Sequence, residues 1–202
     1  MTAQPAEPAT TVFATERLIV RQAGVDDAAM FYALWNNPAV MTHVGFPNGL
    51  LITLEEITAQ LQKQEPGVFH NLLVVARRAT GETIGECFMT QPNQAGIAET
   101  DVKLLPAFWG NKYGVEIKRG LVQYLFEHTE CTAVQATPNI HNLASIKMQE
   151  AVGAVRAGTG KSLIPQPDGA RSITVEYYIY RVYRRIWDKA QRDVHDAAED
   201  TG

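Results

Sequence analysis

The chain has 202 residues, of which 46% are hydrophobic and 20% charged, and its net charge is −4. This length suits one domain with a single core, and the composition is that of a globular protein. The acidic balance lacks the surplus of Lys and Arg that nucleic-acid binding requires and mildly favours a cationic acceptor such as an amine. Because the sequence has no membrane-spanning apolar stretch and no signal-peptide pattern, we expect a cytoplasmic protein without a membrane partner.

The first third of the chain predicts one strand and two helices. Alternation and periodicity give, in order, an irregular tail at 1–11, a strand at 16–23 and helices at 25–36 and 53–64. Thr53 and Glu56 have the spacing of a capping box at the start of the second helix. The apolar loop between the helices, 37–52, is a candidate wall for an acceptor cleft, lined by Tyr32, Trp35 and Phe46. Packing of these side chains against the sheet is an equal alternative.

The rest of the chain alternates between strands and helices. The expected elements are strands at 70–78, 82–90 and 96–105, a helix at 112–128, a strand at 131–137, a helix at 140–152, strands at 154–163 and 171–184, and a polar tail at 188–202. Asn139 is expected to open the second helix and Gly153 to close it. We therefore predict a single α/β domain over 12–187, with a mixed, partly parallel sheet and helices on both faces.

One segment, Leu104–Glu116, is suited to binding phosphate. It places a strand end, Pro106 and a turn bracketed by Gly110 and Gly114 directly before a helix. The start of a helix offers unpaired N–H groups and partial positive charge, and Lys112 adds a cation. An ordinary turn between a strand and a helix is the alternative.

A second segment carries polar residues at another helix start. Asn139, Asn142 and Ser145 recur at three-residue spacing, which brings them together around the first turn of a helix. They predict a polar edge near a strand end. The alternative is a helix cap with two exposed polar neighbours.

Together these segments resemble a known family. The run Thr15–Arg21 (TERLIVR), the Leu-Pro-x-x-Trp-Gly pattern before a helix, and Asn-x-x-Asn-x-x-Ser followed by Glu150 and Gly153 are similar to the GNAT superfamily of N-acetyltransferases. The branch that the chain resembles is that of the ribosomal-protein N-terminal acetyltransferases. The resemblance covers residues 13–187.

The resemblance implies a mixed, mostly antiparallel sheet of about seven strands, in which two central parallel strands, here 96–105 and 131–137, splay apart. Acetyl-CoA would be the co-substrate, with its pantetheine arm in the gap and its pyrophosphate on the turn before the next helix. The cofactor-binding residues implied are Leu104, Asn111, Lys112, Tyr113, Gly114, Val115, Asn139, Asn142 and Ser145. The implied activity is direct transfer of an acetyl group to a primary amine, on a protein N-terminus or a small molecule.

Two positions depart from the family pattern. Lys112 stands where the phosphate turn usually has a glycine, so either its side chain reaches over the phosphates or the turn has changed shape. Gln149 stands where many members have the tyrosine that protonates the thiolate. These departures motivate an alternative function, a catalytically weakened protein that binds CoA or a partner.

Acyl transfer from a thioester to an amine needs a neutral amine and benefits from a proton source for the thiolate. Glu99 and Asp101 share one face of a strand and are candidates for the base or for orienting the acceptor. Ser145 is the candidate for protonating the thiol. A solvated strand face and a helix-start hydroxyl are the respective alternatives.

The remaining reactive side chains predict no further chemistry. The five histidines lack ligand spacing, so no metal site is expected, and Cys87 and Cys131 are expected to be buried free thiols. A homodimer is plausible if the aromatic residues of the last strands form a surface, although core packing explains them equally well. Those residues are Tyr177, Tyr178, Tyr180, Tyr183 and Trp187.

Overall fold

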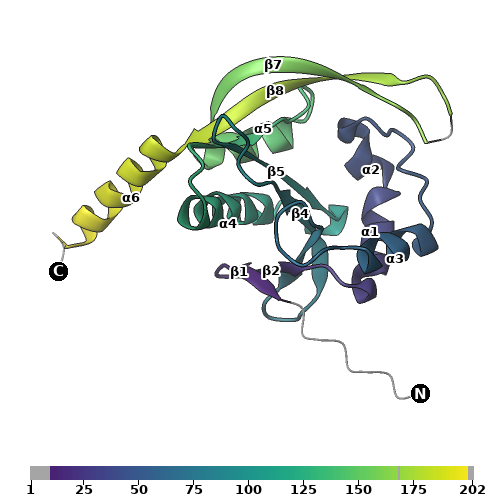
Figure 1. Cartoon of the computed structure of the whole chain (residues 1–202), viewed down its shortest axis with the longest axis horizontal. Helices are drawn as coiled ribbons and strands as arrows, with labels where there is room; N and C mark the ends of the chain where they lie inside the picture. The colour runs from purple at the N-terminus through teal and green to yellow at the C-terminus, as the bar shows by residue number, and fades with distance from the viewer. Residues whose placement is uncertain (1–9, 168, 200–202) are drawn as a thin grey trace.

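The structure, a computed structural model, describes residues 10–167 and 169–199, with side chains as far as residue 191 (Figure 1). Eight strands form one sheet in the order β1-β2-β3-β4-β5-β6-β8-β7. Their bounds are β1 Thr11–Ala14, β2 Leu18–Gln22, β3 Leu73–Arg77, β4 Thr83–Met89, β5 Ile97–Leu104, β6 Ala133–Ala136, β7 Val155–Ile164 and β8 Ile173–Tyr183. All pairings are antiparallel except that of β5 with β6. The predicted mixed, mostly antiparallel sheet is confirmed.

Helices cover both faces of the sheet. Their bounds are α1 Ala28–Trp35, α2 Pro38–Met41, α3 Leu54–Gln62, α4 Tyr113–His128, α5 Leu143–Ala151 and α6 Arg184–Glu199. The protein has two hydrophobic cores, one on each face of the sheet, and the side chains of β3 alternate between them. Leu73 and Val75 join the core under α4, whereas Val74 joins the core under α1 and α3. Figure 1 shows α4 and α5 on one side of β4 and β5, and α1 to α3 on the other.

Several expected boundaries differ from those observed. Of the tail expected at 1–11, residues 1–9 lie outside the described residues. Thr11 begins β1, a strand that was not expected, so the sheet has eight strands rather than seven. The helix expected over 140–152 begins at Leu143, because Asn142 rather than Asn139 caps it. Residues 188–199, expected as a polar tail, continue α6. The capping box of Thr53 and Glu56 is confirmed, with both hydrogen bonds formed.

The hairpin of β7 and β8 arches over α2 (Figure 1). Near its tip, Gln166 Nε2 donates to the Gly45 carbonyl oxygen at 2.9 Å. Gly45 is the residue that allows this approach, because an added Cβ would lie 2.9 Å from Ile164 and from Val175. The hairpin therefore closes one side of the loop that follows α1. Among the described helices, none is long and apolar enough to cross a bilayer.

Candidate functional site

The two parallel strands at the centre of the sheet are paired only at their beginnings. Ile97–Glu99 of β5 pair with Ala133–Gln135 of β6, and Thr100–Leu104 continue beyond the last pair. After β6 the chain turns away, and Asn139 bridges to Tyr177 of β8 instead. The edge of β5 that faces β6 thus loses its partner strand from Thr100 onward. We call this gap between β5 and β6 the split.

The turn that follows β5 presents backbone donors at the start of α4. Lys112 caps the helix in the left-handed conformation, with φ of 60°, and its side chain makes no capping hydrogen bond. Within the described residues, the N–H groups of 111–115 have no hydrogen-bond acceptor, and the first bond of the helix is Glu116 N to the Lys112 carbonyl oxygen. Asn111 turns its amide inward to the Phe108 and Trp109 carbonyl oxygens. Asn111 is therefore placed to contact an anion through its backbone rather than its side chain.

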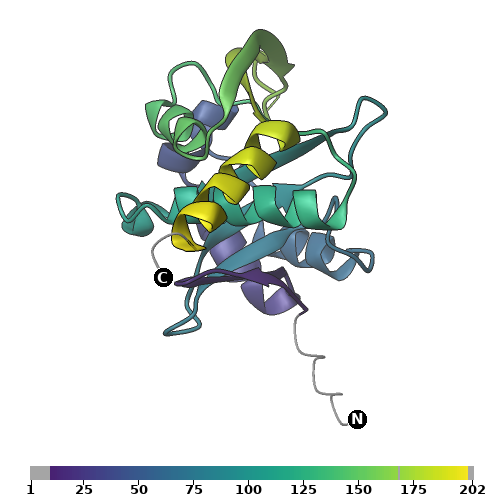
Figure 2. The same cartoon turned by 90° about the vertical axis from the view of Figure 1, so that its left-hand side faces the viewer.

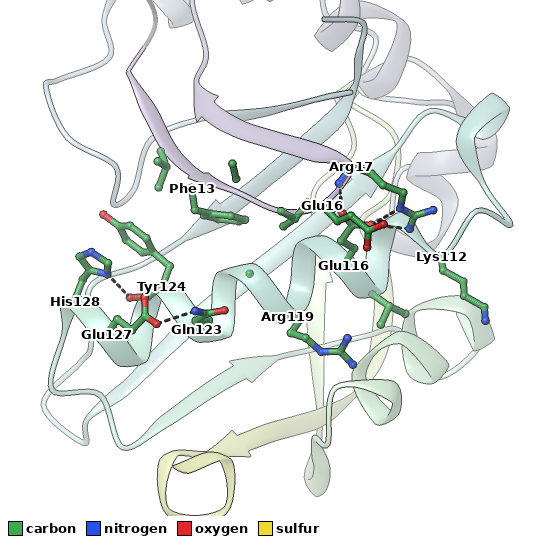
Figure 3. Close-up of a pocket in the computed structure, with 15 residues that line it drawn as sticks. Phe13, Glu16, Arg17, Lys112, Glu116, Arg119, Gln123, Tyr124, Glu127 and His128 are labelled. Carbon is green, nitrogen blue, oxygen red and sulfur yellow. Dashed lines mark hydrogen bonds and ion pairs between the residues drawn. The ribbon is translucent and has the colours of Figure 1, made fainter. Parts of the chain in front are cut away.

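A cluster of polar side chains fastens this turn to the beginning of β2 (Figure 3). Arg17 Nε donates to Glu116 Oε2 at 2.7 Å, and Arg17 Nη1 donates to the Asn111 carbonyl oxygen at 3.2 Å. Thr15 Oγ1 donates to the other oxygen of Glu116, and the Arg17 guanidinium lies over the Tyr113 ring. Partial burial acts to raise the pKa of Glu116, but these donors outweigh it and hold the pKa below its ordinary value. We call these residues the turn clamp.

A shallow groove of about 780 Å³ runs along α4 on the side of β1 (Figure 3). Phe13 covers Gly120, where an added Cβ would lie 2.3 Å from the ring, and Tyr124 stacks on His128 with centroids 4.1 Å apart. Of the residues predicted to bind the cofactor, only Lys112 and Val115 line it. The groove is therefore a feature separate from the split.

The two candidate carboxylates lie on the face of β5 opposite α4. Asp101 bonds to the Lys103 ammonium, which also pairs with Glu86 Oε1 at 3.0 Å. Partial desolvation acts to raise the pKa of Asp101, but the charge of Lys103 outweighs it and holds the pKa below its ordinary value. Trp35 Nε1 donates to Glu86 at 2.9 Å and is buried, so Trp35 belongs to this network rather than to the wall of a cleft.

Glu99 takes part in a different network. Its Oε1 accepts from Gln135 Nε2 at 2.9 Å, and Gln135 Oε1 accepts from Arg181 Nε at 2.9 Å. These three side chains form a row across β5, β6 and β8. Glu99 is exposed and engaged with an amide, whereas Asp101 is engaged with a cation.

The first turn of α5 brings only part of the predicted polar edge together. Asn142 Oδ1 accepts from Ser145 N at 3.0 Å, which is the helix cap. Asn139 points elsewhere, because its Nδ2 donates to the His43 carbonyl oxygen at 3.1 Å. Further along, Gln149 is 2% exposed and its Oε1 has no partner within the described residues. Met148 beside it contacts α4, since a Cβ on Gly114 would lie 2.9 Å from Met148 Sδ.

Sequence reasoning missed one residue of the split, Lys118. Its side chain is 1% exposed, and its Nζ donates to Thr100 Oγ1. Lys118 comes four residues before Val122 and eight before Phe126, both of which are buried on α4. A lysine at this spacing in an otherwise apolar stripe was the signal that could have found it.

The acceptor-side loop is partly folded into the core. Phe46 packs against the core under α1 and α3, whereas Tyr32 is 47% exposed. Tyr32 lines a hollow of about 560 Å³ together with Asn36 and residues 51–55. Both cysteines are buried and free, as predicted. Among the described residues, no group of three or more His, Cys, Asp or Glu side chains is arranged to hold a metal ion.

Residues 17–155 match the family model described as the acetyltransferase (GNAT) domain. The chain belongs to the GNAT acetyltransferase family. This GNAT chain is 28% identical to the uncharacterized protein YkkB of Bacillus subtilis (strain 168) over 148 residues, which are 72% of this chain and 86% of YkkB.

Two solved structures, among others, have the same fold. One is a putative ribosomal-protein-serine acetyltransferase from Vibrio cholerae, with a TM-score of 0.66 and 15% identity over 84% of this chain and 95% of that one. The other is AAC(6')-Ib in complex with ribostamycin and coenzyme A, with a TM-score of 0.63 and 22% identity over 86% of this chain and 97% of that one.

Proposed function

We propose that this GNAT protein is an N-acetyltransferase that moves an acetyl group from acetyl-CoA directly to a primary amine. The observation that carries the proposal is the split, together with the backbone N–H groups of 111–115 at the following helix start, which have no acceptor within the described residues. An unpaired strand edge suits the amides of a pantetheine arm, and a helix start suits a pyrophosphate. The CoA complex of AAC(6')-Ib, a protein of the same fold, supports this use of the fold.

The proposed roles divide between the two faces of β5. Asp101 is assigned to bind the acceptor, because its side chain is 54% exposed and is kept ionised by Lys103. A carboxylate of lowered pKa attracts an ammonium and orients it, and water then carries the proton away. Glu99 extends the acidic face, and we assign Asn142 and Ser145, at the start of α5, to contact the pantetheine arm or the thioester. The acceptor is a protein N-terminus or a small-molecule amine such as an aminoglycoside.

Calorimetric titration of acetyl-CoA into the wild-type protein and a Lys112→Glu variant tests the cofactor assignment. Lys112 is exposed, so the substitution reverses a charge at the phosphate turn without disturbing the core. We expect the variant to bind acetyl-CoA about tenfold or more weakly, since repulsion replaces attraction at short range. Lys63→Glu, at an exposed lysine after α3, is the matched control and should bind as the wild type does.

Thiol release is then followed with a panel of amines that includes aminoglycosides and short peptides with free N-termini. Release that depends on one of these amines supports the transferase. Binding of acetyl-CoA without release over the whole panel would favour the alternative, a protein that binds CoA without turnover. Failure of the wild type to bind at millimolar acetyl-CoA would contradict the cofactor assignment itself.

A further inference from the structure

Lys118 lies in the core at the point where β5 and β6 part. Its Nζ donates to Thr100 Oγ1, and Thr100 is the first residue of β5 beyond the last pair with β6. The Thr100 hydroxyl donates in turn to the Gln135 carbonyl oxygen at 3.3 Å. Two successive hydrogen bonds therefore run from Lys118 across the apex of the split.

The amine of Lys118 has hydrogen-bonding capacity that the protein does not use. An ammonium has three N–H donors, and within the described residues Thr100 is the single partner of Nζ. No carboxylate of the described residues forms an ion pair with it. Burying such a group costs free energy, and groups of this kind are concentrated at functional sites. Lys118 is thus a buried polar group that a ligand in the split would satisfy.

The position of Lys118 relative to β5 separates it from the acceptor. Side chains alternate along the strand, so Ala98 and Val102 pack under α4 while Asp101 is on the other face. Thr100 is on the α4 face and bonds to Lys118. A thioester held in the split would therefore have the acceptor amine on one side and Lys118 on the side away from it.

Other groups on the α4 face are poor proton donors for a leaving thiolate. Gln149 occupies the position of the usual tyrosine, but a carboxamide is not an acid at neutral pH. The Tyr180 hydroxyl already donates to Glu150 Oε1 at 2.9 Å, and the pKa of Tyr180 is raised. The Ser145 hydroxyl gives up a proton much less readily than an ammonium does.

We propose that the Lys118 ammonium lies beside the sulfur of bound CoA and donates the proton that the departing thiolate takes up. This inference rests on the proposed function. In the balanced step the neutral amine forms the C–N bond as the C–S bond breaks. The amine nitrogen loses one proton to water, the CoA sulfur gains one from Lys118, and the neutral lysine regains a proton from water.

The electrostatics of Lys118 suit this role. Burial lowers its pKa to about 7, and the charge of Asp101 opposes the shift. Asp101 is itself paired with Lys103, whose second partner is Glu86, and the thiol of Cys87 in β4 stays neutral because burial raises its pKa. A free thiol has a pKa of about 8.5, so proton transfer from Lys118 to a thiolate is downhill.

The ionisation of CoA bound to the protein tests the proposal without an acceptor. The thiolate is followed by its ultraviolet absorbance from pH 5 to 10 in complexes of CoA with the wild type, Lys118→Met, Lys118→Gln and the control Lys63→Met. The spectrum of each protein without CoA is subtracted. Lys118 and a thiol beside it titrate as a coupled pair, in which the form with thiolate and ammonium contributes part of the first step near pH 7. We therefore expect part of the thiolate to appear near pH 7 in the wild type and in Lys63→Met, whereas in both Lys118 variants the thiol ionises in a single step near its ordinary pKa of about 8.5.

The outcomes separate this inference from the proposed function. If CoA binds to all four proteins and its thiol ionises at the same pH in each, Lys118 is not beside the sulfur and the inference is wrong. If CoA does not bind to the wild type in calorimetry, the proposed function is wrong and the inference falls with it. Thermal melting of the variants is measured first. Two neutral substitutions are used, so that if one variant does not fold, the other still tests the inference.

Discussion

Lys112, at the turn before α4, adopts the backbone conformation that glycine adopts more easily. The sequence left open whether a lysine at this position changes the turn or extends over the phosphates. Its φ of 60° keeps the left-handed shape, and its side chain is exposed at the start of α4. A non-glycine residue in this region is strained by roughly 1 kcal/mol. The turn therefore retains the shape that a glycine would give it and adds a positive charge.

Lys118 predicts a specific pH dependence of stability. Its pKa is lowered to about 7 in the folded protein and is about 10.4 in the unfolded chain. Between these values the unfolded state holds the proton that the folded state has lost, so the free energy of unfolding rises with pH. Relative to Lys118→Met, the wild type should gain about 2 kcal/mol between pH 7 and pH 9.

Urea unfolding of both proteins at several pH values measures this difference. Lys63→Met is the control, and its stability should follow that of the wild type over the whole range. The variant Lys118→Met should also be the more stable protein at pH 6, because the buried charge is gone. Parallel curves for the wild type and Lys118→Met would mean that Lys118 keeps an ordinary pKa.

At the scale of elements, the turn clamp connects the start of β2 to the first turn of α4. Replacing Arg17 by Met removes the guanidinium bonds to Glu116 and to the Asn111 carbonyl oxygen together, whereas the backbone N–H of residue 17 still donates to Glu116. We expect a loss of about 1 kcal/mol in stability and a several-fold weaker binding of acetyl-CoA, because the turn is no longer held. Calorimetry and thermal melting measure the two effects.

Lys161→Met is the matched control for the turn clamp. Lys161 also pairs with a glutamate, Glu176 at 2.5 Å, but that exposed pair joins β7 to β8 rather than to α4. Its removal should leave acetyl-CoA binding unchanged. Equal binding by the Arg17 and Lys161 variants would show that the turn does not depend on its clamp.

Local signals predicted element boundaries well where the hydrogen bonds are local. Thr53 and Glu56 bond to each other's backbone, so their spacing alone identifies the start of α3. Asn139 misled because its side chain forms a local turn before the helix, where its Oδ1 accepts from His141 N, and also bonds to His43, nearly a hundred residues away. Asn142, rather than Asn139, caps α5.

For the whole molecule, the sequence predicted the mixed sheet and, through the family resemblance, the split at its centre. It did not predict β1, whose four residues are recognised only by pairing with β2. Nor did it predict the length of α6, which extends away from the sheet on the side of α4 (Figures 1 and 2). Trp187 of α6 packs on Phe126, Tyr180 is buried and Tyr178 packs against the same core, so three of the aromatic residues considered for a dimer surface serve the core. A homodimer stays a prediction.

Hydrogen–deuterium exchange with and without acetyl-CoA tests the central claim most directly, because it reports where the ligand lies in the whole molecule. Bound cofactor should protect the amides of 111–115 at the start of α4, which have no acceptor within the described residues, and those of Val102 and Leu104, because these two residues of β5 face the split while their neighbours bond to β4. The groove between β1 and α4, including Phe13 and Tyr124, should exchange as before. Protection at the groove, or none at either segment of the split, would contradict the account.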